Sequence, residues 1–181
     1  MLERIFSLIG GNRHTLRNNQ RNVKNKYPIA DEVEIKTPLL EDEGDKFNYI
    51  LRRVLIYFEN NEPYLDPNLK IADVAKNVAT NRNYLSRAIN LGLSRNFNQL
   101  CNYYRVRYAC NLYLNEAEIK VLQMCEKSGF NSNSAFLSAF NSCIGLSPAK
   151  WCKNVNARLQ RRENVTVEDY IKPLIIKNNR L

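Results

Sequence analysis

Two segments of the chain, fifty residues apart, carry amide, hydroxyl and guanidinium side chains at the spacing of one helix face. These side chains are Asn83, Ser86 and Arg87 in the first segment, and Asn133, Ser134 and Ser138 in the second. Asparagine can form two hydrogen bonds with the edge of adenine, and arginine can do the same with guanine. Because such groups on a helix suit the major groove of DNA, we expect these six side chains to contact bases.

Apolar residues at helical spacing predict the elements that would present these side chains. In the first segment, Lys70 to Asn90, the apolar stripes are Ile71, Val74, Ala75 and Val78, and then Leu85, Ala88 and Ile89. In the second, Lys120 to Asn141, the aligned residues are Val121, Met124, Cys125 and Ser128, and then Phe136, Ala139 and Phe140. Each segment is therefore predicted to form two helices joined by a short turn, a helix-turn-helix.

One copy of this pattern would fit a small helical bundle with a solvated polar face equally well. Two copies in tandem favour a duplicated DNA-binding module. The turn contains Ala79 in the first copy and Gly129 in the second. Asn81 in the first copy, and Asn131 or Ser132 in the second, are suitable N-caps for the helix that follows.

These motifs resemble the AraC/XylS family of bacterial transcription regulators across residues 64–153. Residues 81–87 resemble the family's first recognition helix, residues 97–112 its linker helix, and Gly129-Phe130 with residues 145–148 its second helix-turn-helix. The resemblance implies an all-α fold of about seven helices, in which a long linker helix bridges two helix-turn-helix subdomains. It also implies a transcription regulator that inserts two recognition helices, at about 81–90 and 132–141, into successive major grooves.

Three residues depart from the pattern of the family. Ala79 stands where glycine is usual in the first turn, which is tolerable if the residue avoids a positive φ. Ser94 stands where glycine is usual after the first recognition helix. Ser138 stands in the place of a usual arginine, and no Lys or Arg occurs within residues 129–145. We therefore expect the first recognition helix to dominate base recognition.

The charge distribution favours contact with the DNA backbone. Residues 1–46 hold eight basic and eight acidic residues, so the other 19 basic and 10 acidic residues carry the whole net charge of +9. Such an excess also occurs in ribosomal and membrane-surface proteins, so it supports the DNA-binding hypothesis without proving it. The residues expected to contact phosphates are Asn81, Arg82, Arg95, Ser132 and Lys150.

The linker helix has a length that suits two neighbouring grooves. Asn96 is a suitable N-cap, and a helix from there to Leu114 would span ~28 Å at 1.5 Å per residue. One turn of B-DNA is about 34 Å long. Arg105 and Arg107 on this helix could contact phosphates, although Arg105 could equally pair with an acidic residue inside the protein.

The ends of the chain differ from its centre. Residues 1–46 are polar and are predicted to be a linker or disordered segment, largely irregular. Residues 47–153 are predicted to be the DNA-binding domain, and residues 154–181 a C-terminal extension of unknown role. The domain is expected to open with a helix, N-capped by Asp45, whose apolar stripe is Phe47, Ile50, Leu51, Val54, Leu55 and Phe58.

Two alternatives remain open at each end of this domain. The stripe of the opening helix either docks on the first helix-turn-helix or forms the seam of a dimer. In the extension, Arg158, Arg161 and Arg162 could enlarge the phosphate-contacting surface. The apolar residues within 165–176 could dock back on the domain or recruit a partner.

No cluster of residues indicates catalysis, and the expectation is a protein that is not an enzyme. The five cysteines form no C-x-x-C pair, and His14, the only histidine, lies in the polar N-terminal segment. We therefore expect no catalytic residues, no metal and no cofactor.

The expected partner is double-stranded DNA, while RNA polymerase and a second copy of the chain remain open as further partners. No small-molecule pocket is evident. The apolar run at residues 5–9 is far shorter than the about 20 residues of a spanning helix, which favours a cytoplasmic protein without membrane contact. Two other hypotheses stand: a degenerate module that binds another regulator, and the DNA-binding fragment of a larger signalling protein.

Overall fold

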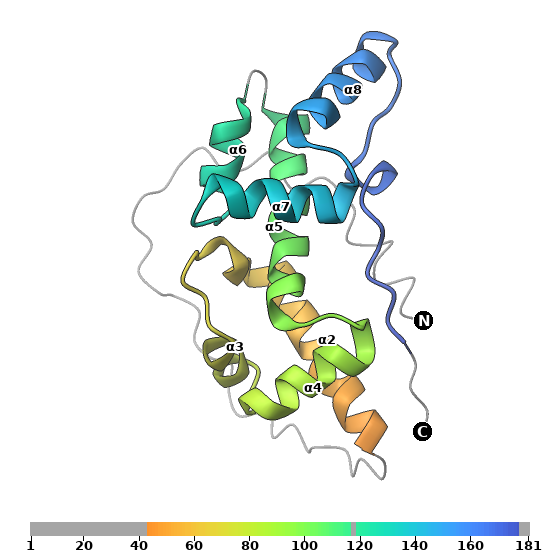
Figure 1. The fold of residues 1–181 in the computed structure, drawn as a ribbon. Coiled ribbons are helices and arrows are strands. Elements are labelled where there is room, and N and C mark those ends of the chain that lie inside the picture. The colour runs from red at the N-terminus through yellow and green to blue at the C-terminus, as the bar shows by residue number, and fades with distance from the viewer. Residues whose placement is uncertain (1–42, 117–118, 178–181) are drawn as a thin grey trace, which may run out of the picture. The chain divides into compact units, whose positions relative to one another are not determined.

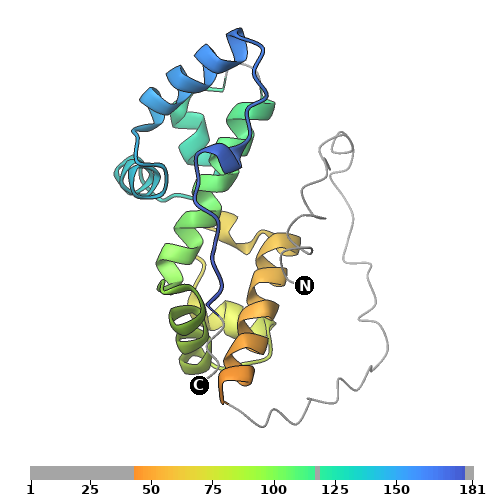
Figure 2. The ribbon, with the colours of Figure 1, turned by 90° about the vertical axis from the view of Figure 1, so that its right-hand side faces the viewer.

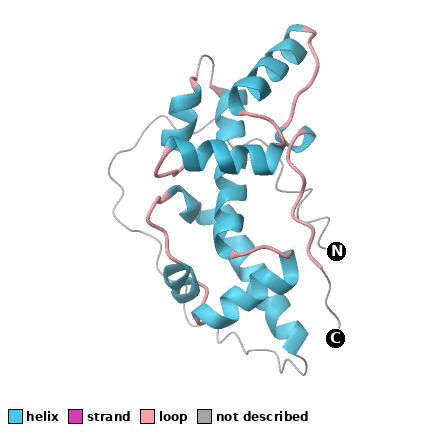
Figure 3. Cartoon of the chain, viewed as in Figure 1, coloured by secondary structure: helices cyan, strands magenta, loops and turns pink. Residues whose placement is uncertain are grey.

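The computed structural model describes residues 43–116 and 119–177, and in these ranges the chain folds into helices and loops without strands (Figure 3). The α-helices are α2 (Glu43–Asn61), α3 (Ile71–Asn77), α4 (Arg82–Leu93), α5 (Phe97–Asn115), α6 (Val121–Lys127), α7 (Asn133–Ile144) and α8 (Pro148–Gln160). Two 3-10 helices, η1 (Pro63–Leu65) and η2 (Val167–Asp169), complete the set. The predicted all-α fold is confirmed; residues 1–42 of the predicted polar segment lie outside the described residues.

Helix α2 covers the first helix-turn-helix. All six residues of its predicted stripe are buried, and the helix packs along α4 (Figure 1). Docking on the first helix-turn-helix is therefore the correct alternative, because the same face cannot also form a dimer seam. The N-cap predicted at Asp45 is wrong, since α2 already includes Glu43. Both carboxylates lie in the first turn, where the helix dipole favours negative charge.

Helices α3 and α4 form the first helix pair, in the register that the sequence predicts. The predicted cap is present, because the Asn81 side-chain oxygen accepts a hydrogen bond from the Tyr84 N–H at 2.9 Å. The turn residue Ala79 has a φ of 46°. The condition that Ala79 avoids a positive φ, under which alanine would be tolerable here, is therefore not met. The left-handed conformation of this alanine costs about 1–2 kcal/mol relative to glycine.

At the end of α4, serine stands at position 94, where glycine is usual, and a glycine stands two residues earlier. Ser94 ends the helix with a φ of 51°, in the conformation that glycine usually provides. Gly92, two residues earlier, lies inside the helix against the side chain of Leu51 from α2, and a Cβ on Gly92 would overlap the Leu51 Cδ2 atom. The glycine is therefore used for the close approach of two helices and not for the turn.

The linker helix α5 begins and ends close to its predicted limits. Asn96 and Gln99 cap it reciprocally, each side-chain oxygen accepting a hydrogen bond from the other residue's N–H at 2.9 and 2.8 Å. Its 19 residues give a length of ~28 Å. The helix packs against η1, α4, α6, α7 and η2. Both helix pairs therefore pack against the same linker helix.

Helices α6 and α7 form the second helix pair, and their turn is held by the segment Pro63–Pro67, which we call the junction. Gly129 has a φ of 80° and lies against the carbonyl oxygens of Tyr64 and Leu65. The Asn131 side chain donates a hydrogen bond to the Pro67 carbonyl at 3.0 Å. The N-cap of α7 is Ser132, which leaves Asn131 to make this contact.

Helix α8 and the extension complete the second half. Ser147 caps α8, and Trp151 is buried. Residues 161–177 turn back on the domain and bury Val167 and Ile171. Of the two alternatives for the apolar residues of this segment, docking on the domain is therefore correct, and recruitment of a partner is not needed to cover them. In the part of the chain that the structure describes, no helix combines the length and the apolarity that crossing a membrane requires.

Candidate nucleic-acid interface

Helix α4 presents a polar face to solvent, opposite the side that it buries. Leu85, Ala88 and Ile89 point into the core. Asn83 and Arg87 are exposed on the other side, and Ser86 is half-buried between them. The three side chains predicted to contact bases in the first helix pair therefore share one accessible face.

Arg87 is the cation at the centre of this face, and α2 partly holds it. Its guanidinium lies 3.8 Å from a carboxylate oxygen of Glu43 and 4.7 Å from the ring centre of Phe47. The Arg87 side chain is nevertheless 57% exposed, and its ion pair is equally open to water. Exposed ion pairs of this kind contribute about 0–1 kcal/mol, so a stronger acceptor can displace Glu43.

Helix α7 presents the equivalent face without a cation. Phe136, Ala139 and Phe140 are buried, whereas Asn133 and Ser138 are exposed on the opposite side. Ser134 is also exposed, and its hydroxyl lies 3.2 Å from the hydroxyl of Ser132. The predicted base contacts of the second helix pair are thus accessible but neutral.

Leu137 is a member of this face that the sequence analysis did not include. When Phe136 is aligned with Leu85, Leu137 falls at the position of Ser86, in the middle of the recognition face. Its side chain is 40% exposed, whereas the neighbouring Phe136, Ala139 and Phe140 of the same helix are buried. The signal was present in the sequence, because within α7 Leu137 is an apolar residue at a position where α4 has the polar Ser86.

The five residues predicted to contact phosphates fall into three groups: two helix caps, two exposed cations and one half-buried arginine. Asn81 and Ser132 use their side-chain oxygens to cap α4 and α7, so any phosphate contact must come from their remaining groups. Arg82 and Lys150 are exposed at the starts of α4 and α8. Arg95 is half-buried, with its guanidinium 5.5 Å from the ring centre of Tyr103.

The two arginines of the linker helix have structural partners. Arg105 donates hydrogen bonds to the carbonyls of Tyr64 and Asp66 at 2.6 and 2.8 Å, and burial lowers the pKa of its guanidinium from the ordinary value. Arg107 pairs with Glu59 at 2.8 Å. Arg105 was expected to contact either a phosphate or an acidic side chain of the protein. It contacts backbone carbonyls of the junction instead of an acidic side chain.

The cysteines belong to the core. Cys101, Cys110, Cys125 and Cys152 are buried, Cys143 is half-buried, and all five are free thiols. Burial raises the pKa of Cys101 to about 12 and also raises the pKa of Cys110. These thiols are therefore protonated at neutral pH and pack as small apolar side chains.

The sequence matches a protein-family model, and the arrangement of helices is similar to that of several solved structures. Residues 74–154 match the model of the family described as a helix-turn-helix domain. The C-terminal domain of AraT, a response regulator from Geobacillus stearothermophilus, shares 27% identity at a TM-score of 0.51, over 58% of this chain and 84% of that one. No curated protein matches the sequence.

Two further solved structures share the fold at lower identity. One is the DNA-binding domain of AdpA, described as the global transcriptional factor and solved with a target DNA, at 20% identity and a TM-score of 0.51, over 63% of this chain and 97% of that one. The other is a DNA-binding transcriptional dual regulator from Escherichia coli K-12, at 18% identity and a TM-score of 0.50, over 58% of this chain and 96% of that one.

Proposed function

Because residues 74–154 match the model of a helix-turn-helix domain, we propose that this chain is a sequence-specific DNA-binding transcription regulator of the AraC type. In this proposal α4 and α7 enter successive major grooves of the same duplex. The observation that carries it is the pair of equivalent helices, each with a buried stripe and an exposed polar face, that rest on one linker helix.

The dimensions of the linker helix support this arrangement. α5 is ~28 Å long, and neighbouring major grooves on one side of B-DNA are about 34 Å apart. The names of the similar structures point the same way, since one was solved with its target DNA. The basic excess beyond residue 46 supplies the attraction to phosphates that such binding requires.

The two recognition helices have different tasks in this proposal. Arg87 of α4 reads a guanine, with Asn83 and Ser86 beside it. On α7, Asn133, Ser134 and Ser138 make weaker polar contacts, and the exposed Leu137 packs on the methyl group of a thymine. Arg82, Arg95 and Lys150, with the capping residues Asn81 and Ser132, hold the phosphates on either side.

The second candidate function is a protein-interaction module that binds another regulator. One observation favours it: α7 carries no Lys or Arg, so it lacks the cation that makes the commonest specific base contact.

A selection from random duplexes decides between the two functions. The full chain should enrich one strong block of a few base pairs and, about one helical turn away, a weaker block rich in A·T pairs. Leu137→Ala should abolish the thymine preference at one position of the weaker block and leave the strong block intact. Leu122→Ala, an exposed leucine on α6, is the matched control and should change neither block. Enrichment of no sequence by the wild-type chain would favour the interaction module.

Substitution of the two arginines of α4 should separate base reading from phosphate binding. Arg87→Ala should weaken binding to the selected duplex by about 1–3 kcal/mol and relax the preference at one guanine. Arg82→Ala, at the start of the helix, should weaken specific and random duplexes about equally. Fluorescence anisotropy titrations measure both effects, and thermal melting checks that loss of the Phe47 contact has not unfolded the domain. Equal losses on both duplexes for Arg87→Ala would show that it is not a base reader.

A further inference from the structure

The segment that follows α8 makes a second connection between the two helix pairs. We call residues 161–177 the C-terminal strap. It leaves the end of α8, passes alongside α5 and ends beside the C-terminal end of α4 (Figures 1 and 2). The junction, Pro63–Pro67, lies on the opposite side of α5 in Figure 1. The strap also lies beyond the family model, which ends at residue 154.

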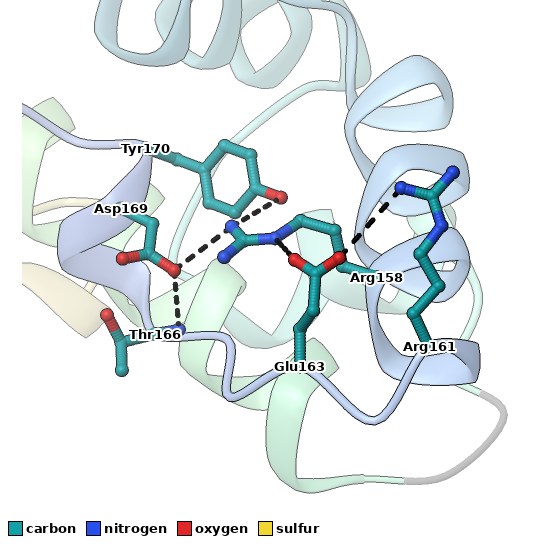
Figure 4. Close-up of polar contacts among 6 residues, drawn as sticks. All are labelled: Arg158, Arg161, Glu163, Thr166, Asp169 and Tyr170. Carbon is teal, nitrogen blue, oxygen red and sulfur yellow. Dashed lines mark hydrogen bonds and ion pairs between the residues drawn. The ribbon is translucent and has the colours of Figure 1, made fainter.

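The first attachment of the strap is a polar cluster centred on Arg158, near the end of α8 (Figure 4). The guanidinium of Arg158 donates to a carboxylate oxygen of Glu163 at 2.8 Å and to one of Asp169 at 3.0 Å. The same Asp169 oxygen accepts a hydrogen bond from the N–H of Thr166 at 3.2 Å. One arginine thus fixes the start of the strap and the helix η2 to α8.

The second attachment is apolar and leads to the recognition helix α7. Val167 and Ile171 are buried, so the middle of the strap is part of the core. The Tyr170 ring lies edge-on to Trp151 at 5.6 Å, and Trp151 lies edge-on to Phe140 of α7, also at 5.6 Å. Any displacement of the strap therefore changes the packing behind α7.

The third attachment is at the other recognition helix. The N–H of Lys177 donates a hydrogen bond to the carbonyl of Gly92 at 2.8 Å. Gly92 lies in the last turn of α4, where carbonyl oxygens have no partner within the helix. The end of the strap thereby supplies a partner for one of them and binds directly to α4.

We propose that the C-terminal strap fixes the relative position of α4 and α7 and so determines which spacing between two DNA half-sites the protein accepts. This inference rests on the proposed function. A single helix that joins two modules can bend and twist, whereas a connection on each side of it resists both motions. A stiff link between two binding modules gives a high effective concentration at the matched spacing and a low one elsewhere.

The test compares affinities for duplexes that carry the two selected blocks at different separations. The spacing is varied in single base-pair steps, and a duplex with the strong block alone serves as reference. Wild-type protein should prefer one spacing sharply. Ile171→Ala and Arg158→Gln should each reduce that preference by about tenfold and leave the affinity for the strong block alone unchanged. Asn164→Ala, an exposed strap residue, is the matched control and should behave as wild type.

The outcomes separate this inference from the function on which it rests. Wild-type protein that binds no duplex would overturn both. Sharp spacing preference in wild type, retained by both strap variants, would overturn the strap inference alone. Circular dichroism shows whether each variant is folded. If Ile171→Ala does not fold, Arg158→Gln still decides the question, because it removes the contacts of the guanidinium with Glu163, Asp169 and Tyr170 and keeps Val167 and Ile171 in the core.

Discussion

Replacing Gly129 by alanine should lower the free energy of unfolding by roughly 2–5 kcal/mol, the largest stability loss expected from any added methyl group in this domain. Two costs combine at this position. The residue has a φ of 80°, and a Cβ would lie 2.7 Å from the carbonyl oxygens of both Tyr64 and Leu65. Because these atoms are backbone, the clash can be relieved only if the junction moves away from the second helix pair. Urea denaturation followed by circular dichroism measures the loss.

Gly145→Ala is the matched control for this substitution. Gly145 has the same φ of 80°, but a Cβ there would meet nothing within 4 Å. Its replacement should therefore cost only the about 1–2 kcal/mol of the left-handed conformation. Equal losses for the two variants would show that the junction does not pack closely against the turn of the second helix pair.

DNA affinity should fall by roughly a hundredfold between 50 and 200 mM salt, the largest effect on binding that the structure predicts. Four cations flank or occupy the two recognition helices: Arg82, Arg87, Arg95 and Lys150. If each releases a counterion, the slope of log affinity against log salt is about −0.9 per contact, or between −3 and −4 in total. Anisotropy titrations at several salt concentrations measure this slope.

Two variants give this slope a control. Arg82→Ala should make it shallower by about one. Lys172→Ala, on the strap, removes a cation that is exposed but remote in sequence from both recognition helices, and it should leave the slope unchanged. A salt-independent affinity would contradict a phosphate-binding surface on this domain.

The repeated part of the fold could be predicted from the sequence because local signals agree there. The apolar stripes, the cap at Asn81 and the paired caps Asn96 and Gln99 each specify a helix within a few residues. The same agreement places the six predicted base-contact residues on the exposed faces of α4 and α7. Leu137 was not predicted because it is apolar and the expected base contacts are polar, although the alignment of the two copies already pointed to its position.

The remaining features depend on contacts between distant residues, which no local signal encodes. Ala79 and Ser94 take left-handed conformations because the helices on either side of them are fixed by packing. The burial of apolar side chains in these helices offsets the conformational free energy that the two residues lose. Arg105 bonds to carbonyls thirty-nine and forty-one residues away, so its partners could not be read from its own helix. The strap docks through the contact of Tyr170 with Trp151 and of η2 with α5, two partners that its own sequence does not indicate.

The burial of Trp151 gives the chain an internal spectroscopic reporter. It is the only tryptophan in the sequence, and the rings of Tyr113, Phe140 and Tyr170 surround it in the second half. Its fluorescence emission therefore follows the second helix pair alone, whereas far-ultraviolet circular dichroism follows the helices of both pairs. Denaturation curves from the two signals will coincide if both pairs melt as one cooperative unit and will separate if they do not. The cooperativity of the whole domain is thus measurable without a dye or an engineered residue.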